Sequence, residues 1–149
     1  MFSEKNVKLG RILAIDYGRK RTGIAVTDEM QLIANGLTTV QTSTLIDFLR
    51  NYFLKEKVDA IVVGIPKTLK NEPSESMRYL SPFLKLIEKT FPNYPIIKID
   101  ERFTSSIAFQ TMIDGGLGKK DRQDKETVDM ISATIILQSY LEQKHNKVI

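Results

Sequence analysis

The sequence predicts an α/β domain built on a five-stranded mixed sheet, in which a three-strand antiparallel meander is followed by two parallel strands and flanked by helices. Two observations lead to this fold class. The first three strand-like segments, residues 11–16, 22–27 and 32–40, are separated by gaps too short for a crossover helix, and such gaps join antiparallel strands. The next two, residues 58–63 and 95–99, each follow a helical pattern, and helical crossovers join parallel strands.

Each element has its own signal in the sequence. Residues 11–16 form a nearly continuous apolar run, which is typical of a strand buried on both faces. Thr42 or Ser43 is expected to cap a first helix, whose apolar side chains recur at helical spacing: Leu45, Phe48, Leu49, Tyr52 and Phe53. A second helix is predicted over residues 76–91, with a kink favoured at Pro82.

The last third of the chain is expected to be helical on either side of a loop. The segment Thr104–Ser106 can cap a helix that ends near Ile113, and the final helix is predicted over residues 125–143. Residues 114–124 between them contain three glycines and several charges, which is typical of a mobile loop. We expect this loop to close over a bound nucleic acid.

Composition excludes several kinds of chemistry. The 149 residues include no cysteine and one histidine, His145, which excludes disulfides, thiolate catalysis and cysteine-type zinc sites and argues against a histidine-based triad. The net charge of +4 allows a polyanionic partner. No apolar run reaches the roughly 18–20 residues of a membrane span and the N-terminus does not resemble a secretory signal, so we expect a cytoplasmic protein without a membrane partner.

The chain is expected to hold one domain. We predict a flexible N-terminus over residues 1–10, a single domain over residues 11–143 and a C-terminal tail over residues 144–149.

Three acidic residues stand out by their positions. Asp16 ends the first strand and Glu101 follows the fifth, and ligands of open α/β sheets bind outside the carboxyl ends of the strands. Asp129 shares a stripe of the last helix with Ala133 and Ile136, where a carboxylate must be paired, protonated or bound to a cation. Each also has an ordinary interpretation: Asp16 as a turn residue, Glu101 as a solvent-facing acid, and Asp129 as an acid that interacts with the helix dipole.

The three acids can act together as a cation site if they meet at one edge of the sheet. Such carboxylates repel one another and bind divalent cations well through their oxygens. Two such ions can stabilise both the attacking and the leaving oxygen in phosphodiester cleavage. This site needs neither histidine nor cysteine, which fits the composition.

Four segments resemble the signatures of the YqgF (RuvX) family and occur in the family's order. They read LAIDYGRKRTGIAVTD from Leu13 to Asp28, VVGIP from Val62 to Pro66, DERFT from Asp100 to Thr104 and VDMISA from Val128 to Ala133. The resemblance extends from about residue 10 to residue 141. It implies an RNase H-like fold related to the RuvC Holliday-junction resolvases, and a nuclease of bacterial ribosome biogenesis that matures the 5′ end of pre-16S ribosomal RNA.

The resemblance also implies roles for individual residues. Asp16, Glu101 and Asp129 are the expected catalytic acids and metal ligands, with Mg²⁺ or Mn²⁺ as the cofactor. The expected substrate-binding residues are Arg19, Lys20 and Arg21 of the basic hairpin, Arg102, and Thr104, which supplies a hydroxyl or a helix N-terminus.

Two positions depart from the family's usual pattern. The loop after Pro66 lacks the glycine that is usual around position 71 or 72, and Ser132 stands where alanine is more common. The first change concerns a substrate-facing loop, and neither change concerns the three acids.

Three functions remain open from the sequence. The first is a metal-dependent nuclease that acts on structured RNA such as precursor ribosomal RNA, or on branched DNA in the manner of a Holliday-junction resolvase. The second is a nucleotide-binding phosphotransferase or ATPase, because the spacing from Asp16 through Gly18 to Gly23 also resembles the phosphate hairpin of the actin and sugar-kinase superfamily. The third is a non-catalytic RNA-binding assembly factor. The sequence predicts neither an oligomeric state nor endonuclease or exonuclease action.

Overall fold

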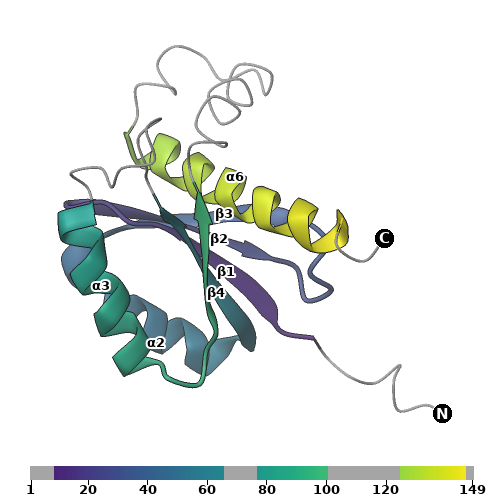
Figure 1. Cartoon of the computed structure of the whole chain (residues 1–149), viewed down its shortest axis with the longest axis horizontal. Helices are drawn as coiled ribbons and strands as arrows, with labels where there is room; N and C mark the ends of the chain where they lie inside the picture. The colour runs from purple at the N-terminus through teal and green to yellow at the C-terminus, as the bar shows by residue number, and fades with distance from the viewer. Residues whose placement is uncertain (1–8, 66–76, 101–124, 147–149) are drawn as a thin grey trace.

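A computed structural model describes residues 9–65, 77–100 and 125–146 of the chain (Figure 1). Its elements, in chain order, are β1 (Arg11–Asp16), β2 (Arg21–Thr27), β3 (Ala34–Gln41), the short 3-10 turn η1 (Thr42–Thr44), α2 (Leu45–Lys55), β4 (Val58–Ile65), α3 (Met77–Thr90), β5 (Ile96–Asp100) and α6 (Lys125–Asn146). The helix predicted over residues 104–113 and the loop predicted over residues 114–124 lie outside the described residues.

The five strands form one mixed sheet in the order β3-β2-β1-β4-β5. Strand β2 pairs antiparallel with both β1 and β3, whereas β4 pairs parallel with both β1 and β5. The predicted fold class is therefore confirmed. Because β1, β4 and β5 are parallel, their carboxyl ends, at Asp16, Ile65 and Asp100, lie at the same edge of the sheet.

Helices cover both faces of the sheet: α2 and α3 lie on one side and α6 on the other (Figure 1). Alternate residues of β1 therefore enter two different cores. Leu13 and Ile15 pack with α2 and α3, whereas Ile12 and Ala14 pack with α6. By the same alternation Asp16 belongs to the α6 side of the sheet, and it is half-buried there.

The start of β3 differs from the prediction. The sequence placed it at about Leu32, but the strand begins at Ala34. The carboxylate of Asp28 accepts hydrogen bonds from the amides of Met30, Leu32 and Ile33 at 3.1, 2.8 and 2.8 Å. These bonds hold the segment in a turn, so the apolar residues after Asp28 are part of the turn and are exposed.

The start of the first helix also differs. Neither Thr42 nor Ser43 caps α2; both lie in η1, the N-cap position falls on Thr44, and no side chain makes a capping hydrogen bond there. The side chain of Thr42 instead bonds to the β1–β2 hairpin. The last helix was predicted to end near Gln143, and α6 continues to Asn146. Within the described parts of the chain, no helix is both long and apolar enough to span a bilayer.

Candidate functional site

Asp16, at the end of β1, and Asp129, near the start of α6, lie at the same place on the sheet. Asp16 of β1 pairs with Gly23 of β2 in the antiparallel register. A Cβ built on Gly23 would overlap the backbone carbonyl of Asp129, so the first turns of α6 rest directly on β2 at this glycine. The close approach requires a residue without a side chain at position 23. The two acidic residues predicted from the sequence therefore occupy neighbouring backbone positions on one face, at the edge where the parallel strands end.

Two further contacts fix the beginning of α6. The hydroxyl of Thr39 on β3 donates a hydrogen bond to the backbone carbonyl of Glu126 at 2.6 Å. Gly36, also on β3, lies so close to Met130 that a Cβ there would come within 2.7 Å of the Met130 Cγ. One and two turns beyond Asp129, Ala133 and Ile136 are buried against the sheet. The stripe inferred from the sequence thus faces the sheet. Asp129 lies at the N-terminal end of this stripe, at the edge of the sheet.

Arg21 pairs with Asp129. The Nε of Arg21 donates a hydrogen bond to the Asp129 Oδ2 at 3.2 Å, and the two side chains are 33% and 26% exposed. An ion pair this accessible to water contributes at most about 1 kcal/mol to stability. Its main consequence is electrostatic: the Arg21 guanidinium compensates the negative charge of the Asp129 carboxylate. Of the three states open to Asp129 from the sequence, the structure shows the paired one.

A shallow cavity of about 500 Å³ opens at this ion pair. Its lining residues are Gly18, Arg19, Lys20, Arg21 and Asp129. Three of these five are bases, and Arg19 and Lys20 are exposed to solvent. A cavity with this lining attracts an anion such as a phosphate group and places it next to a carboxylate.

Thr42 holds the basic hairpin in place. Its hydroxyl donates a hydrogen bond to the Gly18 carbonyl at 2.6 Å and lies 2.9 Å from the Thr22 hydroxyl. Its amide donates to the Lys20 carbonyl at 2.9 Å. The hairpin itself turns at Gly18, where a Cβ would overlap the Arg21 carbonyl oxygen. Sequence reasoning missed Thr42, because its long-range partners leave no local pattern.

Two ring contacts attach the same hairpin to α3. Tyr17 stacks on Phe83 with ring centroids 4.3 Å apart, and the Arg19 guanidinium lies over the Tyr79 ring, 4.2 Å from its centroid. Tyr79 and Phe83 are four residues apart and lie one above the other on the helix. Sequence reasoning also missed Tyr79, which carries no motif.

The structure gathers five of the eight predicted site residues. Arg19, Lys20, Arg21 and Asp129 line one cavity, and Asp16 lies on the adjacent strand position, opposite Gly23. The other three, Glu101, Arg102 and Thr104, lie outside the described residues. Within residues 9–65, 77–100 and 125–146, no three His, Cys, Asp or Glu side chains form a group able to hold a metal ion.

Comparisons with known proteins agree on one family. The family model described as RuvX, Holliday junction resolvase, matches residues 10–143. A relative from Flavobacterium johnsoniae is 60% identical over 134 residues, covering 90% of this chain and 97% of the relative. A relative from Bacteroides fragilis is 59% identical over 136 residues, covering 91% and 99% of the two chains. Both relatives carry the name "Putative pre-16S rRNA nuclease".

Solved structures agree on the fold. Thermus thermophilus RuvC in complex with a Holliday junction substrate aligns with a TM-score of 0.56 at 14% identity, covering 91% of this chain and 96% of RuvC. A second Thermus thermophilus RuvC structure aligns with a TM-score of 0.51 over 90% of this chain and 96% of RuvC. These neighbours have the RNase H-like fold, which confirms the fold expected from the resemblance. With its family model, relatives and fold in agreement, the chain belongs to the RuvX family.

Proposed function

We propose that the chain is a metal-dependent nuclease that processes pre-16S ribosomal RNA at its 5′ end. The observation that carries the proposal is the position of Asp16 and Asp129 on one face of the sheet edge, directly beside a basic hairpin. Carboxylates can bind a cation there, and the hairpin can bind the phosphates of a nucleic acid. The names of the relatives, which are 59–60% identical, support the same activity and substrate.

The residues present fit a divalent cation. Asp16 and Asp129 offer the carboxylate oxygens that Mg²⁺ and Mn²⁺ prefer, and a divalent ion bound there would share Asp129 with the Arg21 guanidinium. We propose that Asp16, Asp129 and Glu101, which directly follows β5, are the protein ligands. A divalent ion bound there supplies Lewis acidity that polarises the phosphodiester and makes water a better nucleophile.

Basic side chains of this chain bind the substrate and stabilise the developing charge. Arg19 and Lys20 bind the backbone phosphates on either side of the scissile bond and so align the substrate with the carboxylates. Arg21 pairs with Asp129 and lines the same cavity, where its guanidinium can stabilise negative charge that develops on the phosphate. Arg102 and Thr104, which follow Glu101 in sequence, add further phosphate contacts in this proposal. Recognition through phosphates reads the shape of the RNA rather than its sequence.

A second candidate is cleavage of branched DNA. It is favoured by the family description, Holliday junction resolvase, and by the likeness in fold to RuvC bound to a junction. Family membership favours both nuclease activities over the phosphotransferase considered from the sequence.

A cleavage assay with two substrates tests the proposal. The full chain is incubated with Mg²⁺ and either a precursor RNA that spans the 5′ end of 16S ribosomal RNA or a four-way DNA junction. We expect cleavage of the RNA at the mature end, and a loss of at least about a hundredfold in Asp16→Asn and in Asp129→Asn. Asp47→Asn is the matched control, because Asp47 lies on α2 with its side chain 80% exposed.

The pattern of results separates the alternatives. Cleavage of the junction alone would replace the RNA nuclease with the second candidate. Tight binding of the precursor RNA without cleavage at any Mg²⁺ or Mn²⁺ concentration would identify a non-catalytic assembly factor.

A further inference from the structure

The contact between Arg19 and Tyr79 lies at the rim of the proposed site. Arg19 comes from the β1–β2 hairpin and Tyr79 from the first turn of α3, and the guanidinium carbon is 4.2 Å from the ring centroid. Tyr79 remains 42% exposed although the guanidinium covers part of its ring, and Arg19 is exposed as well. The pair therefore presents planar side-chain surface to solvent.

Packing alone does not require this exposed ring. The neighbouring contact, between Tyr17 and Phe83, already joins the hairpin to α3, and Phe83 is only 5% exposed. Phe83 thus belongs to the core, whereas Tyr79, one helical turn earlier, lies outside it. Because Tyr79 is 42% exposed, part of its ring remains accessible to a ligand.

The chemistry of the pair suits an unpaired nucleobase. Bases stack on aromatic rings and on the guanidinium planes of arginine, and a base inside a duplex is not free to do so. Arg19 also lines the cavity that contains Asp129, so the planar surface adjoins the proposed cleavage site. We propose that Arg19 and Tyr79 form a stacking subsite for an unpaired nucleobase, and that the substrate is single-stranded next to the scissile phosphate. This inference rests on the proposed nuclease function and specifies its substrate class.

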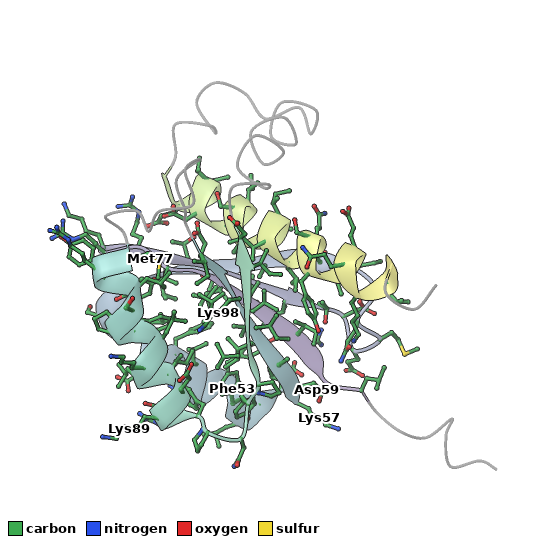
Figure 2. The ribbon with its side chains drawn as sticks, viewed as in Figure 1. Phe53, Lys57, Asp59, Met77, Lys89 and Lys98 are labelled. Carbon is green, nitrogen blue, oxygen red and sulfur yellow. The ribbon has the colours of Figure 1, made fainter. Side chains whose placement is uncertain are left out.

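The charge of the adjacent surface fits the same ligand. Arg78, Lys85 and Lys89 are exposed, and their spacing of seven and four residues places them along one solvent-facing side of α3. Figure 2 shows Lys89 at the far end of this helix from Met77, so the basic side runs along α3 away from the hairpin. A single strand whose base stacks at Tyr79 has basic side chains along its path, which attract its phosphates.

The alternative role for Tyr79 is structural: its ring holds the Arg19 guanidinium in place to bind a phosphate. The two roles differ in their dependence on the base. A stacking subsite distinguishes a strand with bases from a base-free strand of equal charge, whereas a support for Arg19 affects both strands equally.

The test compares two probes of the same length and phosphate count, a short fluorescent oligoadenylate and a strand in which base-free tetrahydrofuran residues replace the adenosines. Anisotropy titrations use the full chain in EDTA, so that the proposed cleavage does not occur. The variants are Tyr79→Leu, which removes the ring, and Tyr79→Phe, which keeps it. Leu86→Ala is the matched control, because Leu86 is 48% exposed on the same side of α3, two turns away from the hairpin.

We expect the wild-type chain to bind the oligoadenylate at least about fivefold more tightly than the base-free strand. This ratio is the lower limit of the affinity gain expected from stacking of one base. Tyr79→Leu should lose this preference, while Tyr79→Phe and Leu86→Ala should keep it. An equal loss of affinity for both probes in Tyr79→Leu would overturn the subsite and leave Tyr79 as a support for Arg19. Equal binding of both probes by the wild type would overturn it too. Binding of neither probe, nor of the precursor RNA, would overturn the nucleic-acid function itself.

Discussion

Replacement of Gly23 by alanine should displace the start of α6, and with it Asp129, although no charged residue is replaced. The new Cβ would overlap the Asp129 carbonyl carbon and oxygen and would lie only 3.0 Å from the Met130 amide nitrogen. All of these are backbone atoms of α6, which cannot rotate out of the way, so strand and helix must separate by on the order of 1 Å. Overpacking of this kind costs about 1–3 kcal/mol. A displacement of about 1 Å at the start of α6 is enough to reduce catalysis roughly a hundredfold.

Gly36→Ala is the matched control. Its Cβ would meet the Met130 side chain, 2.7 Å from Cγ and 3.1 Å from Sδ, and a methionine can change rotamer to make room. Urea unfolding of both variants gives the two stability losses, and the RNA cleavage assay gives the two activities. We expect Gly23→Ala to be less stable than Gly36→Ala by at least about 1 kcal/mol and to lose most of its activity. Equal stability and activity in the two variants would refute the close approach of α6 to β2.

Three more predictions concern the hairpin and the β2–β3 turn. Thr42→Val should cost about 1–3 kcal/mol, because it leaves the Gly18 carbonyl without its hydroxyl partner, and should speed amide exchange in the hairpin; unchanged exchange would contradict its role. Lys20→Ala should flatten the salt dependence of RNA binding by about 0.7–0.9 per lost phosphate contact, whereas Lys55→Ala, at the far end of α2, should not. Hydrogen bonds from the amides of Ile33, Leu32 and Met30 lower the pKa of Asp28, and together they outweigh the opposing effect of burial. The folded state thus loses stability as the pH falls below about 4. Asp28→Asn should remove this loss, which urea unfolding between about pH 3 and pH 6 measures. An identical pH profile in the variant would show that the turn does not depend on the carboxylate.

The sequence was sufficient for the sheet and for part of the site. The apolar runs of β1 and β4 identified buried strands, because burial on both faces leaves few polar positions. The stripe through Asp129 was equally informative, since Ala133 and Ile136 do pack on the sheet. These signals are local and repeat along the chain, so they can be recognised without knowledge of the partner elements.

The contacts that set the geometry of the site could not be predicted in this way. Gly23 lies against Asp129, which is 106 positions later in the chain, and a glycine in a strand does not indicate what approaches it. Thr42 precedes a helix, where a threonine normally indicates a cap, but its hydroxyl bonds to Gly18 instead. The start of β3 was misplaced because Leu32 and Ile33 are apolar, although the turn held by Asp28 exposes them. For Thr42 and for the start of β3, a long-range or turn-specific hydrogen bond outweighs the local pattern.

The central claim is that Asp16 and Asp129 share one cation site at the edge of the sheet. Addition of substoichiometric Mn²⁺ to the ¹⁵N-labelled full chain tests it directly, because the paramagnetic ion broadens the amide signals near its binding site. We expect selective broadening at Asp16, Gly23 and Asp129, abolished in an Asp16→Asn, Asp129→Asn double variant, while the amides of Asp28 and Asp59 at the opposite end of the sheet stay sharp. Broadening centred on Asp28 or Asp59, or the same broadening in the double variant, would contradict the account.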